Sequence, residues 1–394
     1  MSADAESRTL TIMLVVGEPS GDKLGAQLMA ALKQVAGKHV RIVGVGGAAM
    51  AAEGLESLYP LDATSVMGLR EVVPRIPAIL RRVREASDFA ILTRPDLVVL
   101  IDSPDFTHRI AQRLKRIDPS IRTANYPPPQ VWASRAYRAR KMARYMDAVL
   151  TMFAFEAAFF ERHGIRAYNV GYPVIERADK IAGGAEFRRR HGISADAPLL
   201  VVLPGSRRNE IRFILPPFRA AVEMLARDIP GLVTVLPTVS HVAALVKAAV
   251  AKWPTPLHIV DTEPEKYAAF DAADAALAAS GTVTSELALA KVPMVVAYKV
   301  GWLTYALAKP FMHVRYMVLV NLVLGRKAIP EFEQYAATPQ ALVQALKPLL
   351  TDESARANQM RDLEEGVRAF GMGQETPSLR AARVVLELAG AKSS

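Results

Sequence analysis

Two aspartates at the end of a strand-like run are the first residues in this sequence with the types and spacing for chemistry. The stretch LIDSPDF places Asp102 and Asp105 directly after the apolar residues Leu100 and Ile101. Partial burial at the end of a strand raises the pKa of a carboxyl group, and a raised pKa suits a general base. Asp105 is better placed as the cap of the helix that follows. Asp102 is therefore a candidate general base, and a purely structural aspartate is the alternative.

A second acidic loop, GEPSGDKLG at residues 17–25, joins a strand-like run to a helix-like run. The spacing of its glycines does not match the G-x-G-x-x-G fingerprint of dinucleotide-binding domains. Its carboxylates, Glu18 and Asp22, would repel a phosphate, whereas carboxylates and backbone N–H groups together suit the hydroxyl groups of a sugar. Ser20 and Asp22 are also good helix caps, but capping alone would leave Glu18 unexplained.

Two loops in the second half of the sequence favour an anionic ligand instead. In the first, LPGSRRNEI, Gly205 and Ser206 let the backbone approach a ligand closely, and Arg207 can donate two hydrogen bonds to phosphate oxygens. No G-K-[S/T] follows, so this is not a Walker A loop. The alternative is a capped turn with solvated arginines.

In the second loop, AASGTVTSELALA, residues Ser280, Gly281 and Thr282 would present N–H and hydroxyl groups at the start of a helix, which suits a pyrophosphate. Glu286 lies on that helix, where it can accept hydrogen bonds from a ribose diol. A capping box with a surface glutamate is the alternative for any one of these residues. Two phosphate-binding loops in the same half of the chain together predict a nucleotide site.

These loops need strands to position them, and strand-like runs precede all four. Short β-branched runs alternate with helical patterns, and the pattern restarts after residue 175. Such alternation predicts βαβ units with parallel sheets. We therefore predict an α/β protein of two doubly wound, Rossmann-like domains facing across a cleft, the first at residues 1–175 and the second at 176–365. Ligands of such sheets bind outside the carboxyl ends of the strands.

Composition excludes several kinds of site. The 394 residues include no cysteine, which excludes disulfides, zinc–thiolate sites and cysteine nucleophiles. The first residues, MSADAESRTL, lack the features of a signal peptide, and no apolar run approaches the ~20 residues that span a bilayer. The net charge of +10 favours binding to nucleic acid or to an anionic membrane surface. The alternative is that the basic residues only increase solubility.

A basic amphipathic segment at residues 65–85, with five arginines, predicts contact with an anionic membrane. The residues expected to touch lipid are Val66, Met67, Leu69, Val72 and Val73. The alternative is a helix whose apolar face packs in the core. A second basic stretch, residues 109–144, holds ten Lys or Arg against one acid. No nucleic-acid-binding motif accompanies it, so we expect no nucleic acid partner.

Taken in order, these loops and several further stretches resemble the lipid-A-disaccharide synthase family of glycosyltransferases, which have the GT-B fold. The stretches are GEPSGDKLGA, GVGGAAMAAEG, SVMGLREVVPRI, IDSPDF, VWASR, FAFEAAFFERHGI, VGYPV, LPGSRRNEI, AASGTVTSELALAKVPMVVAYKV and NLVLGRKAIPEFEQ. The resemblance implies an inverting enzyme that joins UDP-2,3-diacylglucosamine to the 6-hydroxyl of 2,3-diacylglucosamine 1-phosphate. The products would be a β(1→6)-linked disaccharide and UDP.

The resemblance also implies a role for each candidate residue. Asp102 would be the catalytic residue, and Glu18, Ser20 and Asp22 would lie on the acceptor side. The residues implied in nucleotide binding are Arg207, Ser280, Gly281, Thr282, Glu286, Asn321 and Gln334. The UDP-sugar would be a substrate, and no metal or other cofactor is expected, because arginine and helix N-termini can stabilise the leaving pyrophosphate.

The resemblance further implies that the helices at residues 366–394 pack back on the first domain, and it suggests a homodimer. We expect a cytoplasmic enzyme bound peripherally to the inner face of the inner membrane. The sequence departs from the usual family pattern on the acceptor side, at Asn125, Pro127, Pro128, Gln130, Ser134 and Tyr172. A diverged paralogue with another lipid acceptor is therefore one alternative. A UDP-sugar 2-epimerase of the same architecture and a non-catalytic lipid-binding relative are the others.

Overall fold

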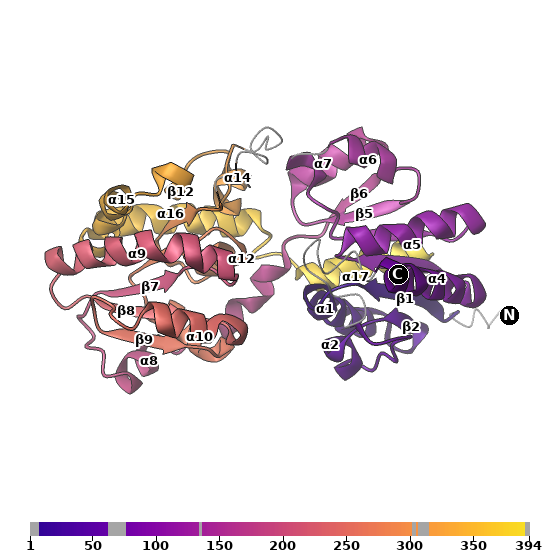
Figure 1. Ribbon diagram of the computed structural model, residues 1–394. Coiled ribbons are helices and arrows are strands. Elements are labelled where there is room, and N and C mark those ends of the chain that lie inside the picture. Colours follow the sequence, from indigo (N-terminus) through magenta and orange to yellow (C-terminus); the bar gives the residue numbers. More distant parts are fainter. Residues whose placement is uncertain (1–7, 62–75, 134–135, 302–304, 306–314, 391–394) are drawn as a thin grey trace. The chain divides into compact units, whose positions relative to one another are not determined.

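A computed structural model describes residues 8–61, 76–133, 136–301, 305 and 315–390. The chain forms two compact units, one of Met1–Pro173 with Gln374–Ser394 and one of Val174–Gly373 (Figure 1). Each unit contains its own parallel six-stranded sheet with helices on both faces. The predicted class, an α/β protein with two doubly wound sheets, is confirmed.

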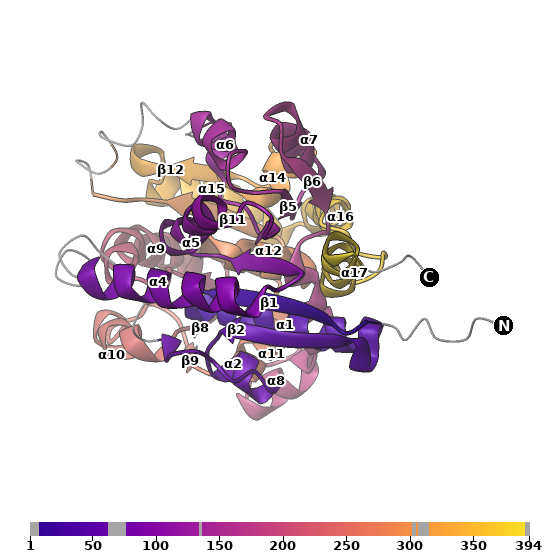
Figure 2. The ribbon, with the colours of Figure 1, turned by 90° about the vertical axis from the view of Figure 1, so that its right-hand side faces the viewer.

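The sheet of the first unit has the strand order β2-β1-β3-β4-β5-β6. Its strands are β1 (Leu10–Val16), β2 (Val40–Val45), β3 (Leu97–Ile101), β4 (Thr123–Tyr126), β5 (Ala148–Thr151) and β6 (Arg166–Asn169). Ile12 and Leu14 of β1 pack with α1 (Pro19–Ala36) and α17 (Pro377–Ala389). Met13 and Val15 pack with α4 (Ile76–Thr93) and α5 (Pro104–Ile117), which run side by side (Figure 2). Both faces are covered, which explains the continuous apolar run of β1.

The sheet of the second unit has the order β12-β11-β10-β7-β8-β9. Its strands are β7 (Leu199–Leu203), β8 (Val233–Pro237), β9 (Leu257–Val260), β10 (Ala275–Ala279), β11 (Met294–Tyr298) and β12 (Glu331–Glu333). One core cluster joins Val202 and Leu277 of the sheet to Phe218 of α9 (Arg208–Asp228) and Leu342 of α15 (Pro339–Thr351). The unit also contains α8 (Gly184–Arg190), α10 (Ser240–Ala249), α11 (Glu263–Ala272), α12 (Thr282–Leu289), α14 (Leu319–Leu324) and α16 (Glu353–Ala369).

Strand order reverses once in each sheet, between β1 and β3 in the first and between β7 and β10 in the second. At such a switch point the two loops that follow the neighbouring strands turn to opposite faces and leave a crevice, where doubly wound proteins bind ligands. The loops at the first switch point contain Glu18 and Asp102, and those at the second contain Arg207 and Gly281. All four loops selected on chemical grounds therefore stand at a switch point.

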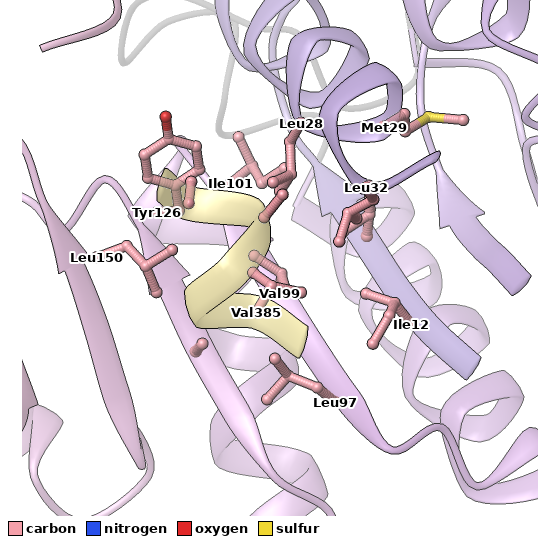
Figure 3. Close-up of a cluster of buried hydrophobic side chains, with 14 of the residues drawn as sticks. Ile12, Leu28, Met29, Leu32, Leu97, Val99, Ile101, Tyr126, Leu150 and Val385 are labelled. Atoms are coloured by element: carbon pink, nitrogen blue, oxygen red, sulfur yellow. The ribbon is translucent and has the colours of Figure 1, made fainter. Parts of the chain in front are cut away.

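Helix α17 ends the described chain in the core of the first unit rather than of the second. Its apolar face packs against α1 and against β1 and β3. Val385 is fully buried in the cluster that contains Ile12, Leu28 and Val99 (Figure 3). The Arg122 guanidinium also donates to the carbonyl of Leu388 at 2.8 Å. The last helix thus completes one face of the sheet that carries Asp102.

The segment predicted to touch lipid is only partly described. Val66, Met67, Leu69, Val72 and Val73 lie outside the described residues. The helix that follows, α4, leaves Ile76 and Leu80 exposed. None of the helices in the described residues has both the length and the hydrophobicity that a membrane crossing needs.

We predict that Val385→Ala lowers the free energy of unfolding by about 2 kcal/mol, because two buried methyl groups are lost and a cavity remains. Chemical denaturation followed by circular dichroism measures this change. Val384 is a matched control, since it is only partly buried against the same cluster, and its alanine variant should lose less stability. Equal losses at both positions would contradict the described packing of α17.

Candidate active site

The carboxylate of Asp102 lies at the first switch point, directly after β3. Its Oδ2 accepts a hydrogen bond from the Ser20 hydroxyl at 2.7 Å, and its Oδ1 accepts one from the Ser103 N–H at 2.8 Å. Asp102 and Ser103 both have left-handed backbone, with φ of 56° and 45°. This conformation costs roughly 1–3 kcal/mol per non-glycine residue and is concentrated at functional sites. The strained turn holds a half-buried carboxylate in one orientation.

The loop after β1 closely approaches the Asp102 loop. The Ser103 hydroxyl donates a hydrogen bond to Glu18 Oε1 at 3.1 Å. A Cβ at position 17 would stand 2.5 Å from the Cβ of Ser103, so Gly17 is needed for this approach. Two carboxylates and two hydroxyl groups from separate loops thus lie together. Groups of this kind can accept hydrogen bonds from the hydroxyls of a sugar.

Asp22 is not part of this group, although it lies in the same loop. It is buried, and its carboxylate accepts hydrogen bonds from three backbone N–H groups, those of Gly47 at 2.7 Å, Ala49 at 2.9 Å and Met50 at 3.1 Å. These groups begin the short helix α2 (Ala48–Ala52) after β2. The alternative that Ser20 or Asp22 caps its own helix is wrong, because no side chain caps α1. Asp22 instead fixes the neighbouring strand-end loop.

His108 and Asp105 are the other titratable residues near Asp102 in the sequence. The His108 ring is buried, with Nε2 3.0 Å from Asn125 Oδ1 and Nδ1 3.3 Å from the hydroxyl of Tyr145. Burial lowers the pKa of His108, so the ring stays neutral inside this network. Asp105 lies exposed in the first turn of α5, and the expectation that it caps that helix is wrong, because no side chain does so.

A row of aromatic side chains, absent from the sequence predictions, follows the ends of the next three strands. Trp132 contacts Phe155 edge to face with ring centroids 4.9 Å apart, and the row continues through Phe153 to Tyr172. The indole N–H of Trp132 donates to Glu156 Oε1 at 2.9 Å. Burial raises the pKa of Glu156. In the sequence, Trp132, Phe153 and Phe155 belong to the stretches VWASR and FAFEAAFFE. Neither stretch shows that the loop after β4 contacts the loop after β5.

At the second switch point, Arg207 is the N-cap residue of α9 and is paired with Glu210. The guanidinium lies 3.0 Å from Glu210 Oε1, while Oε2 of the same carboxylate accepts the N–H groups of Ser206 at 2.9 Å and Arg207 at 3.1 Å. A Cβ at Gly205 would stand 2.4 Å from that Oε2. The donors expected to bind a phosphate are therefore occupied by an internal carboxylate. In the sequence, Glu210 follows Arg207 by three residues, which is the spacing of a capping box and could have predicted this pairing.

The second loop at this switch point begins α12. Gly281 is its N-cap residue, and a Cβ there would meet open space, so ligand atoms can approach the backbone. Glu286 on the same helix is buried and carries two cationic partners, Arg177 and Lys266, with the lysine Nζ 2.9 Å from Oε2. The Tyr267 hydroxyl also donates to Oε1 at 3.2 Å. Glu286 is thus no surface residue, and a ribose would have to share it with these groups.

Asn321 and Gln334, the last two residues implied in nucleotide binding, differ in their surroundings. Asn321 is fully buried and exchanges two 2.8 Å hydrogen bonds with the backbone of Ile329. Gln334 accepts the Val300 N–H at 3.2 Å through Oε1, but its buried Nε2 has no hydrogen-bond partner among the described residues. Its φ of 47° is left-handed as well. A strained residue with an unused buried donor is typical of a ligand contact.

No group of three or more His, Cys, Asp or Glu side chains in the described parts of the chain could hold a metal ion. At the second switch point, Arg207 and the first backbone N–H groups of α9 and α12 supply positive charge.

Comparison with known proteins identifies the family. A family model described as lipid-A-disaccharide synthetase matches residues 12–381. Lipid-A-disaccharide synthases from Rhodospirillum centenum and Paramagnetospirillum magneticum are each 45% identical to this chain. The alignments cover 97% and 96% of this chain and 95% and 97% of the relatives. The chain belongs to the lipid-A-disaccharide synthetase family.

Solved structures that resemble the chain share its fold at low sequence identity. The S. aureus MnaA–UDP co-structure has a TM-score of 0.64 and 15% identity, and the alignment covers 98% of both chains. An apo structure of OtsA has a TM-score of 0.63 with 12% identity, covering 96% of this chain and 99% of the other. These likenesses agree with the GT-B fold class that the family resemblance implied.

We predict that Asp22→Asn lowers the free energy of unfolding by about 2 kcal/mol, because the amide keeps one acceptor oxygen and loses the charge that strengthens three hydrogen bonds. Urea denaturation of both variants measures the difference, with Asp105→Asn as the control, since that side chain is exposed. An Asp22→Asn protein as stable as Asp105→Asn would show that the link to α2 is dispensable.

Proposed function

We propose that this protein joins UDP-2,3-diacylglucosamine to 2,3-diacylglucosamine 1-phosphate with inversion. The product is the β(1→6)-linked lipid A disaccharide 1-phosphate, and UDP is released. Family membership over nearly the whole chain supports this activity. The observation that carries the mechanism is the Asp102 carboxylate, held in a strained turn at a switch point beside Glu18 and Ser20.

Asp102 acts as the general base on the acceptor. The 6-hydroxyl oxygen attacks the anomeric carbon of the donor, its proton passes to Asp102, and the bond from that carbon to the UDP oxygen breaks. A primary hydroxyl has a pKa far above neutrality, so a positioned base accelerates such a step by roughly 10²–10⁴-fold. Glu18 and Ser20 orient the acceptor hydroxyls, and Asp22 acts indirectly by holding the adjacent loop.

The nucleotide binds at the second switch point. The residues proposed to form this site are Arg207, Ser280, Gly281, Thr282, Glu286, Asn321 and Gln334. The diphosphate lies at the N-terminal ends of α9 and α12, where Arg207 and backbone N–H groups stabilise its charge, and no metal ion takes part. Gln334 contributes its unused Nε2 donor. Asn321 acts through the backbone of Ile329, to which it is bonded.

Membrane contact is proposed through Val66, Met67, Leu69, Val72 and Val73, which lead into the exposed apolar side chains at the start of α4. The substrates are acylated, so peripheral binding at the inner face of the inner membrane brings the enzyme to them. The UDP-sugar 2-epimerase alternative is not favoured. A solved UDP-GlcNAc 2-epimerase from Neisseria meningitidis is 11% identical to this chain, whereas lipid-A-disaccharide synthases reach 45%.

We predict that Asp102→Asn reduces turnover at least ~100-fold, because asparagine keeps the size and most hydrogen bonds but cannot accept the proton. The assay supplies acylated donor and acceptor and follows the disaccharide by mass spectrometry. UDP affinity and melting temperature should stay near those of the wild type. Normal turnover by the asparagine variant would make Asp102 structural and place the base elsewhere. An inactive wild-type protein would instead reject the proposed substrates.

We predict opposite effects at the two partners of the α9 ion pair. Arg207→Ala should weaken UDP binding by about 1.5–3 kcal/mol, the value of a charge-assisted hydrogen bond to phosphate. Glu210→Gln should strengthen it several-fold, since glutamine still serves a capping box but no longer competes as an anion for the same donors. Calorimetric titration with UDP measures both changes. Weaker binding by Glu210→Gln would show that the carboxylate supports the loop for the ligand rather than excluding it.

A further inference from the structure

A groove of about 630 Å³ lies between α9 and α10, outside the residues assigned above. Its volume is in the range of small-molecule binding sites. The part that α9 contributes runs from Arg208 to Glu223, and its lining residues recur every three to four positions along one helical face. Because a helix rises about 1.5 Å per residue, this stretch is about 22 Å long. The groove is therefore long enough for an extended chain molecule.

The middle of the groove is apolar. Leu215 and Pro216 of α9 line it together with Leu245 and Ala249 of α10. Leu245 is 39% exposed although it is a large aliphatic residue on a helix with a well-packed inner face. Ala220 and Ala249 are small, which keeps the groove open. A surface of this kind suits hydrocarbon.

Charged side chains line both ends of the groove, and two arginines lie at the end next to Arg207. Arg208 and Arg212 line that end, and in the described part of the chain neither guanidinium pairs with a carboxylate. At the other end Glu223 pairs with Arg227 at 2.8 Å, and Arg219 donates to the carbonyl of Lys252 at 2.7 Å. Arg219 also has no carboxylate partner among the described residues, but two of these three arginines lie next to Arg207, where the diphosphate is proposed to bind. A ligand that fits this pattern has an anionic group joined to a long apolar chain.

We propose that this groove binds one acyl chain of the acylated UDP-sugar, with the diphosphate at the Arg208 end. The proposal rests on the proposed function, because it takes the donor to be an acylated nucleotide sugar. The apolar middle part of the groove buries the methylene groups, and each buried methylene contributes about fourfold in affinity. The groove thereby selects an acylated donor over a UDP-sugar that carries only a short acetyl group.

Two tryptophan variants of α10 test the proposal. Ala249→Trp fills the groove from its rim, and Ala248→Trp adds the same bulk on the same helix at an exposed position that does not line it. Calorimetric titrations with UDP, UDP-N-acetylglucosamine and an acylated UDP-glucosamine are carried out on both variants and the wild type. The acylated UDP-glucosamine used in the titrations carries short acyl chains, so that it is soluble in water and does not form micelles.

The expected result is that Ala249→Trp weakens binding of the acylated donor at least about tenfold, the value of one to two methylenes. It should leave the affinity for UDP and UDP-N-acetylglucosamine within twofold, and Ala248→Trp should change none of the three. An Ala249→Trp protein that binds the acylated donor like wild type, or that loses UDP equally, overturns the groove assignment. A wild-type protein that binds UDP but neither binds nor turns over the acylated donor overturns the proposed function as well.

Discussion

The parallel pairing of β1 with β3 is the constraint on which the Asp102 site depends. Val16 lies opposite Ile101 in the register, so the two strands end side by side and their loops meet. β3 is apolar and buried along its whole length and β1 is nearly so, and the polar residues Glu18 and Asp102 lie where these two strands end. Gly17 then allows the close approach that brings Ser103 to Glu18. A one-residue change in register would separate these groups.

The second switch point differs from the first in its charges. A loop proposed to bind a diphosphate has hydrogen-bond donors that are costly to leave unpaired when the nucleotide is absent. Glu210 accepts hydrogen bonds from these donors and pairs with Arg207, while Glu286 is paired with Arg177 and Lys266. Both carboxylates are therefore satisfied by their own unit. In the proposed function, nucleotide binding is an exchange of one anion for another, and its affinity depends on how readily each internal ion pair dissociates.

Local sequence patterns predicted the strands and the position of Asp102 directly after one of them, because apolar runs and the residues that end them are neighbours in the sequence. They could not predict what Asp22 contacts, since its partners begin 25 residues later and are backbone groups without a sequence signature. The pairing of Glu286 with Arg177 spans 109 residues and was missed for the same reason. Alternatives framed as local capping were wrong at Ser20, Asp22 and Asp105. Ser20 and Asp22 instead form hydrogen bonds with groups far along the chain, Ser20 with Asp102 and Asp22 with the backbone of Gly47.

The acceptor-side departures from the family pattern can be assessed by what their side chains contact. Asn125 donates to the carbonyl of Leu100 at 2.7 Å and also meets His108, so its amide is satisfied inside the unit. Tyr172 is buried in the aromatic row beside Phe153. At Asn125 and Tyr172 the departures therefore concern side chains packed inside the unit, while the carboxylate and hydroxyl groups proposed to act on the acceptor are present around Asp102.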